Sequence, residues 1–241
     1  MAETLFISDL HLDGERPRIL DILLRLLATD AARADALYVL GDLFEYWIGD
    51  DDPVPELRPA VQAIRRLADG GVPVYFAHGN RDFLVGERFA AESGCRLLGE
   101  ETVIDLYGTP TLLLHGDSLC SDDVDYMKFR TQVRDPRWQA TFLALPLEER
   151  RKQATMARQV SRESTRNKRP EITDVNADAV NDALRRHGLH QMIHGHTHRP
   201  AFHDLDLDGR PARRIVLGDW YERGSVLRCS DDGRMQLCQL D

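Results

Sequence analysis

Short apolar segments that each end in a polar turn recur along the first half of the chain, and they limit the folds that it can adopt. Residues 4–8, 36–40 and 72–77 are apolar and short, so we predict that they form buried strands. Between them, residues 17–27 and 55–69 carry apolar side chains at helical spacing. This alternation of strand and helix predicts a parallel sheet covered by helices, the α/β class.

The second half of the chain has a different pattern. Residues 102–106 and 111–115 predict a hairpin, whereas residues 122–169 carry almost no strand signal and predict helices broken at prolines. Beyond them we predict one helix and then several strands, at residues 178–187, 189–193, 202–207, 214–217, 225–229 and 235–240. We therefore expect a single domain, residues 1–241, with two packed sheets flanked by helices and a helical cap inserted at about residues 122–170.

The composition excludes some classes of function. The chain has 241 residues and a formal net charge of −9, which disfavours binding to nucleic acid. It has no basic and apolar leader and no apolar run of about 18 residues, so we expect neither a secretion signal nor a membrane span. The four cysteines form no C-x-x-C pair, and we expect reduced thiols and a cytoplasmic protein.

Five motifs that follow predicted strands carry side chains of the kinds that bind metals. They are Asp9-Leu10-His11, Gly41-Asp42, Gly79-Asn80-Arg81-Asp82, His115-Gly116-Asp117 and His194-Gly195-His196-Thr197-His198. Each motif alone has an ordinary structural explanation, such as an exposed turn or a packed histidine. Because the carboxyl ends of parallel strands meet at one rim of a sheet, the five motifs together predict a shared site.

The chemistry of these ligands indicates the kind of metal and reaction. The motifs offer imidazole, carboxylate and amide groups without a thiolate, which suits Mn²⁺, iron or zinc. One carboxylate can bridge two ions about 3.5–4 Å apart, the spacing found in two-metal hydrolases. Two such ions acidify a shared water and neutralise charge on a phosphoryl group. We therefore predict a two-metal hydrolase that cleaves a phosphorus–oxygen bond.

The ordered motifs D-x-H, GD, GN-x-D, HGD and GHTH resemble those of the calcineurin-like metallophosphoesterases. This resemblance implies that family's two-sheet β-sandwich flanked by helices, with two Mn²⁺ ions per chain. It also implies the ligands of each ion. One ion would be held by Asp9, His11, Asp42 and His198, and the other by Asp42, Asn80, His115 and His196, with Asp42 as the bridge.

Longer segments resemble one branch of that family, which cleaves an acylated UDP-sugar in lipid A synthesis. They are TLFISDLHL, YVLGDLFEYWIGDDD, YFAHGNRDFLVG, HGDSLCSDDVDY and IHGHTHRPA. The likeness implies hydrolysis of UDP-2,3-diacylglucosamine to UMP and 2,3-diacylglucosamine 1-phosphate (lipid X), with water attacking the α-phosphorus. It also implies a peripheral protein at the cytoplasmic face of the inner membrane. From the net charge we expect no nucleic-acid partner, and no obligate protein partner is evident.

The residue after Asn80 sets this branch apart. Most relatives with the fold have histidine there, whereas this chain has Arg81, which does not donate a proton at neutral pH but can clamp diphosphate oxygens. We therefore expect Asn80, Arg81 and Asp42 to act in catalysis.

The resemblance implies that the substrate is contacted by Asn80, Arg81, Asp123, Ser161, Thr165, Lys168 and His196. The family often has asparagine in place of Thr165, where Asn167 could substitute, and Tyr126 is a further candidate.

Several features of the sequence each allow two interpretations. The sequence VLGD at residues 39–42 recurs at residues 216–219, and we interpret Asp219 as a turn or supporting residue rather than a ligand. Asp82 and Asp117 could each orient an imidazole or cap a turn. The cap is rich in arginine and lysine, which form either an ordinary solvated helix face or a surface that rests on an anionic membrane.

Two other functions compete with the preferred one. The first is a phosphoesterase with the same metal centre that acts on another nucleotide or phosphoester. The second is a non-catalytic interaction protein built on this fold, which would be expected to lack some of the metal ligands. This chain has every ligand of the family pattern, so we prefer an enzyme.

Overall fold

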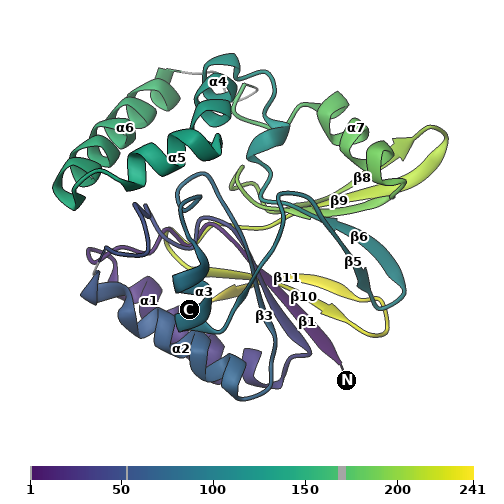
Figure 1. Ribbon diagram of the computed structural model, residues 1–241. Coiled ribbons are helices and arrows are strands. Elements are labelled where there is room, and N and C mark those ends of the chain that lie inside the picture. Colours follow the sequence, from purple (N-terminus) through teal and green to yellow (C-terminus); the bar gives the residue numbers. More distant parts are fainter. Residues whose placement is uncertain (1, 53, 168–171) are drawn as a thin grey trace.

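A computed structural model of the chain describes residues 2–52, 54–167 and 172–241, and the side chains of all of these except residues 161–167. It contains two β-sheets with helices around them, so the predicted α/β class and two-sheet arrangement are confirmed (Figure 1).

The first sheet has the strand order β11-β10-β1-β2-β3-β4. Its strands are β1 (Glu3–Ile7), β2 (Ala36–Leu40), β3 (Val74–Ala77), β4 (Arg96–Leu97), β10 (Gly224–Ser230) and β11 (Met235–Leu240). The strands β1 to β4 are parallel, as the alternation with helices predicted. The hairpin of β10 and β11 extends the sheet beyond β1 in the antiparallel direction, so β1 lies inside the sheet.

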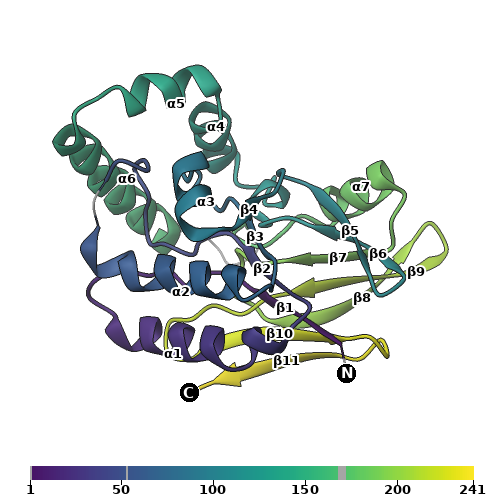
Figure 2. The same cartoon turned by 60° about the horizontal axis from the view of Figure 1, so that its bottom comes forward.

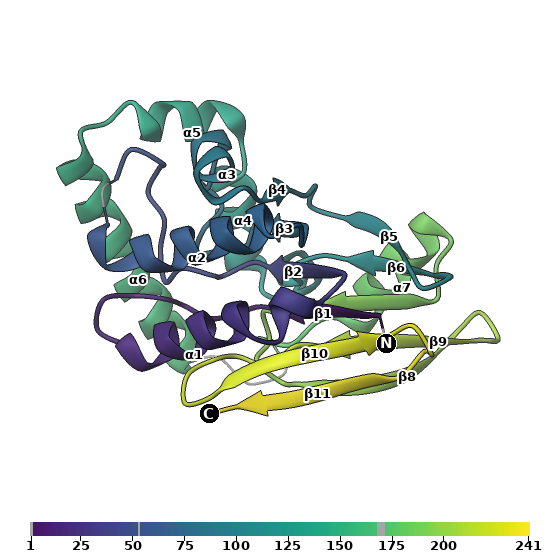
Figure 3. The ribbon, with the colours of Figure 1, turned by 90° about the horizontal axis from the view of Figure 1, so that it is seen from below.

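Helices cover the outer face of this sheet. They are α1 (Pro17–Ala28), α2 (Arg58–Asp69) and α3 (Glu87–Ser93). Helix α1 begins at a proline, which is well tolerated in a first helical turn. Its buried side chains recur every three or four residues, at Ile19, Ile22, Leu23, Leu26 and Leu27, and pack into the core beneath the sheet. Figures 2 and 3 show α1 and α2 side by side on this face.

The second sheet has the strand order β5-β6-β7-β9-β8. Its strands are β5 (Thr102–Leu106), β6 (Thr109–Leu113), β7 (Gln191–His194), β8 (Ala201–Leu207) and β9 (Arg210–Val216). The predicted hairpin of β5 and β6 is confirmed. Strand β9 begins four residues before the predicted start at residue 214, because Asp208 and Gly209 adopt positive φ angles that close a tight hairpin with β8. Helix α7 (Ala177–His187) packs on the outer face.

The two sheets meet through a shared apolar layer. Phe6 and Leu40 of the first sheet pack with Leu113, Ile193 and Ile215 of the second. All five side chains are fully or almost fully buried. This packing brings the carboxyl ends of β1, β2 and β3 to the same side of the molecule as those of β6 and β7, where the predicted ligands follow.

Three helices occupy the region that was predicted to be a cap. They are α4 (Val124–Val133), α5 (Pro136–Leu143) and α6 (Leu147–Asn167), and they lie together on one side of the molecule (Figure 1). Helix α5 begins at Pro136 and α6 begins directly after Pro146, as predicted, whereas the break predicted at Pro170 lies outside the described residues. The Asp135 side chain caps the start of α5. Among the described residues no helix, α6 included, has the length and apolar character needed to cross a membrane.

A buried arginine fastens the cap to the core. Arg150 of α6 is only 2% exposed. Its guanidinium donates to the Ile48 carbonyl at 2.7 Å, to the Asp51 carboxylate at 2.8 Å and to the Leu145 carbonyl at 3.1 Å. Gly49, with φ of 130°, lies so close to Arg150 that a β-carbon there would collide with the guanidinium. The loop after β2 therefore has a glycine at position 49, where the Arg150 guanidinium lies against the backbone.

We predict that Arg150→Met loosens the cap. The substitution leaves the buried Ile48 carbonyl and the partly buried Leu145 carbonyl without this donor, and an unpaired buried carbonyl costs about 1–3 kcal/mol. The melting temperature should fall by about 2–4 °C per kcal/mol, and limited proteolysis should cut α6 faster. Lys152→Met is the control, because Lys152 is exposed and pairs only within α6. Equal protease sensitivity of both variants would contradict the fastening role.

Candidate metal centre

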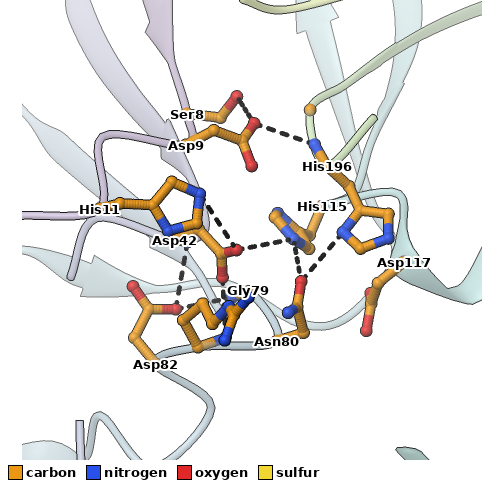
Figure 4. Close-up of polar contacts among 12 residues, drawn as sticks. Ser8, Asp9, His11, Asp42, Gly79, Asn80, Asp82, His115, Asp117 and His196 are labelled. Carbon is orange, nitrogen blue, oxygen red and sulfur yellow. Dashed lines mark hydrogen bonds and ion pairs between the residues drawn. The ribbon is translucent and has the colours of Figure 1, made fainter. Parts of the chain in front are cut away.

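The predicted ligands come from the ends of five strands in both sheets. Asp9 and His11 follow β1, Asp42 follows β2, and Asn80 follows β3. His115 follows β6, while His196 and His198 follow β7. Figure 4 shows most of these side chains pointing toward one another.

The backbone at these ligands is unusual. Only seven non-glycine residues in the described part of the chain have positive φ angles, and five of them are predicted ligands: Asp9, His11, Asp42, His196 and His198. Their φ values lie between 49° and 68°, in the left-handed region that such residues rarely adopt. The other two lie in hairpin turns. Strain concentrated in this way is typical of functional sites.

Glycines allow the ligand turns to approach one another closely. A β-carbon on Gly79 would collide with the Asp42 side chain, and one on Gly195 would collide with Asp9 and Ser8. The glycines in the GN and GH motifs are therefore required by the spacing between neighbouring turns.

One group of ligand atoms gathers around His11 and His198. The two Nε2 atoms are 3.4 Å apart. Asp9 Oδ1 lies 3.3 Å from His198 Nε2, and Asp42 Oδ2 lies 3.8 Å from His11 Nε2. All four side chains belong to the set predicted for the first ion.

A second group gathers around Asn80. Its Oδ1 lies 3.0 Å from His115 Nε2 and 2.9 Å from His196 Nδ1. Asp42 Oδ2 is 3.7 Å from His115 Nε2 and also borders the first group, so Asp42 lies between the two (Figure 4). This is the position that the bridging role requires.

Burial and charge at these groups fit divalent cations. Asp9, His11, Asp42 and His115 are each at most 3% exposed. Burial lowers the pKa of His115, but the Asp42 and Asp9 carboxylates outweigh it and raise the pKa to about 9. Burial and Asp42 together raise the pKa of Asp82 to about 6. Buried carboxylates thus create a negative potential that a bound cation would neutralise, and the donor set of imidazole, carboxylate and amide suits such a cation.

Comparison with known proteins identifies the family. The family model for calcineurin-like phosphoesterases matches residues 3–200, a span that contains every predicted ligand. The chain belongs to the calcineurin-like metallophosphoesterases.

Similar proteins cover almost the whole chain. It is 54% identical to the UDP-2,3-diacylglucosamine hydrolase of Stenotrophomonas maltophilia, over 95% of this chain and 96% of that protein. It is 53% identical to the UDP-2,3-diacylglucosamine hydrolase of Klebsiella pneumoniae, over 95% of both chains. Among solved structures, a novel archaeal phosphodiesterase shares the fold, with a TM-score of 0.50 and 11% identity over 99% of both chains.

Asp82 and Asp117 of this metallophosphoesterase have different supporting roles, and neither accepts a hydrogen bond from a ligand imidazole in the described structure. Asp82 is fully buried and accepts hydrogen bonds from the backbone N–H groups of Gly79 and Leu43, both at 2.8 Å. Asp117 instead accepts from Tyr126 and Arg130 of α4. Asp82 therefore fixes two ligand turns against each other, and Asp117 connects a ligand motif to the cap.

The repeated VLGD segment is also accounted for. Asp219 accepts from the backbone N–H of Tyr221 at 3.1 Å, and its other oxygen lies 3.8 Å from His198 Nδ1. Asp219 therefore lies behind a ligand, on the side away from Asp9.

Three residues that contact the ligands were not predicted from the sequence. Ser8 donates to Asp9 at 2.6 Å. Tyr221 stacks on the His11 ring, with ring centres 5.5 Å apart, and Glu45 lies 3.1 Å from His11 Nδ1. Glu45 is three residues after Asp42, so an acidic residue close behind a ligand motif was the available signal.

The predicted substrate contacts are only partly described by the structure. Arg81 donates its backbone N–H to Asp42 at 2.8 Å, which keeps it at the metal centre. Asp123 caps α4 by accepting from the Tyr126 N–H, and the Tyr126 ring stacks on His196. Ser161 and Thr165 lie in α6 beyond the described side chains, and Lys168 lies outside the described residues.

We predict that divalent metal stabilises the folded chain. At a free Mn²⁺ concentration of 100 times Kd, binding to the folded state adds about 2.7 kcal/mol, which corresponds to roughly 5–10 °C in melting temperature. Asp42→Asn should lose most of this shift because it removes the shared carboxylate. Thermal melts of chelator-treated protein with and without Mn²⁺ measure both effects. An equal shift in the variant would show that the metal binds elsewhere.

Proposed function

We propose that this chain hydrolyses the diphosphate bond of UDP-2,3-diacylglucosamine, giving UMP and 2,3-diacylglucosamine 1-phosphate in lipid A biosynthesis. The observation that carries the proposal is the match of 53–54% identity along 95% of the chain to UDP-2,3-diacylglucosamine hydrolases. A match of this length includes the cap as well as the metal centre, so it bears on the substrate and not only on the family.

The metal centre would hold two Mn²⁺ ions, one on Asp9, His11, Asp42 and His198 and one on Asp42, Asn80, His115 and His196. When bound, such ions lower the pKa of a water molecule and neutralise charge on the phosphoryl oxygens. The chain's own contribution is to fix the ligands in buried turns whose backbone is held by Asp82. Preorganisation of this kind avoids rearrangement during the reaction.

Arg81 would stabilise the diphosphate as the bond breaks. Its backbone is fixed beside Asp42, and its buried Nε has no hydrogen-bond partner among the described residues. A guanidinium remains charged at neutral pH and donates in a forked geometry that fits phosphate oxygens. The departing group is a phosphate monoester, which leaves without a strong proton donor. An arginine therefore serves where many relatives have histidine.

The cap would hold the lipid part of the substrate. The proposed contacts to the glucosamine-phosphate part are Asp123, Ser161, Thr165 and Lys168. The residues proposed to face the phosphate are Asn80, Arg81 and His196. Large apolar side chains are exposed on the cap helices, at Val124, Phe129, Leu143, Met156 and Val160. Exposed apolar groups beside basic residues suit acyl chains and an anionic bilayer. We therefore propose a peripheral position on the cytoplasmic face of the inner membrane.

We predict that Arg81→Ala lowers kcat by about 10²–10³-fold, the usual loss when one donor to the transition state is removed. Arg81→Lys should restore part of the rate, since lysine keeps the charge but not the forked geometry. Turnover of the acylated UDP-sugar and of a simple aryl phosphate should be compared in Mn²⁺. Faster turnover of the aryl phosphate than of the acylated UDP-sugar by the wild type would contradict the proposed lipid substrate.

The position of attack has its own test. Hydrolysis in ¹⁸O-labelled water should place the label on UMP, because the water attacks the phosphorus bonded to uridine. Mass analysis of both products measures this directly. Label on the lipid phosphate would overturn attack at the α-phosphorus.

A further inference from the structure

The turns that follow β1 and β2 lie side by side and place Glu45 next to His11. The His11 N–H donates to the Asp42 carbonyl at 2.9 Å, and the Leu12 N–H donates to the Leu43 carbonyl at 2.9 Å. The Glu45 N–H then donates to the Leu12 carbonyl at 3.0 Å. The backbone of Glu45 is therefore fixed relative to that of His11, and their proximity does not depend on one side-chain rotamer.

The Glu45 carboxylate lies behind the imidazole of His11. Glu45 Oε2 is 3.1 Å from His11 Nδ1, while the Nε2 on the opposite side of the ring faces Asp42 and His198. An imidazole that binds a cation through Nε2 must carry its proton on Nδ1, and that N–H needs an acceptor. Both side chains are almost completely buried, with 3% and 10% of their surface exposed, so water competes little for this role.

The other oxygen of the same carboxylate reaches the cap. Glu45 Oε1 accepts from Arg158 of α6 at 2.6 Å. The Arg158 guanidinium also lies over the Tyr46 ring, 5.2 Å from its centre. The neighbouring ion pairs between cap and core join Arg150 to Asp51 and Arg151 to Asp52, and within the described residues neither aspartate contacts a predicted ligand. Glu45 differs from these aspartates because its carboxylate contacts both a predicted ligand, His11, and a residue of the cap, Arg158.

We infer that Glu45 is a positioning residue that sets the ring of His11 for metal binding and connects that ligand to the closed cap through Arg158. The inference rests on the proposed metal-dependent function. One carboxylate holds the proton-bearing side of a ligand and a cation of the cap at the same time. Separating α6 from the core removes Arg158, one of the cationic groups that face the buried Glu45 carboxylate together with Arg81 and His11. The Glu45 carboxylate therefore couples the position of α6 to the orientation of the His11 ring.

The test measures metal affinity directly. Mn²⁺ binding to the full-length protein is followed by the EPR signal of free Mn²⁺, without substrate. Glu45→Ala should weaken binding of one ion by about 10–100-fold, the usual loss when a group supporting a ligand is removed. Glu45→Gln should fall between Glu45→Ala and the wild type, because an amide oxygen still accepts from His11 Nδ1 but carries no charge for Arg158. Wild-type affinity in Glu45→Ala would overturn the inference.

Asp51→Asn is the matched control. It removes the charge that pairs with Arg150 at the boundary of cap and core, and Asp51 makes no contact with a predicted ligand in the described part of the chain. Its Mn²⁺ affinity should equal that of the wild type, and a loss as large as that of Glu45→Ala would show that any cap ion pair has this effect. If Glu45→Ala does not fold, Glu45→Gln decides alone, and wild-type affinity in that variant overturns the inference.

The same variants separate this inference from the proposed function. Steady-state turnover of the acylated UDP-sugar should show a lower kcat for Glu45→Ala at limiting Mn²⁺ and substantial recovery at high Mn²⁺. If the wild type fails to turn over this substrate, the proposed function fails. The ordering of Mn²⁺ affinities would still test Glu45, because that measurement contains no substrate.

Discussion

The concentration of buried carboxylates at the meeting point of the two sheets is the constraint on which the rest of the structure depends. Asp9 and Asp42 lie among histidines with almost no exposure to water, and Asp82 lies directly behind them. Charges in such a place require compensation by hydrogen bonds and by cations. The strained turns, the glycines at Gly79 and Gly195 and the N–H groups that surround Asp82 all follow from meeting this requirement.

The sequence was sufficient for the α/β class, most of the elements and the set of ligands that the structure brings together. Each of these depends on local patterns: apolar runs of strand length, apolar side chains at helical spacing, and ligand types directly after strands. Every predicted metal ligand from Asp9 to His198 lies in one of the two groups of converging atoms. The assignment of ions to these residues stays a prediction.

The features that could not be predicted from the sequence depend on contacts between segments that are distant along the chain. Nothing in the pattern around Glu45 shows that its carboxylate faces His11 on one side and α6 on the other. Tyr221 stacks on His11 across more than two hundred residues of sequence. The charged face of α6 was open to two interpretations, and three of its arginines, Arg150, Arg151 and Arg158, bind core carboxylates. The partners of Glu45, Tyr221 and the arginines of α6 are therefore known only from the tertiary structure.

The position of β1 inside its sheet has a consequence for the order in which the chain can fold. Strand β1 is synthesised before β2, which can pair with one of its edges early, but its other edge is covered by β10, which is synthesised much later. Asp9 likewise receives its backbone contact from Trp220 late. A ribosome-bound chain that lacks these last residues exposes an unpaired apolar strand next to the incomplete metal centre. Full protection of that edge therefore waits until β10 has been synthesised.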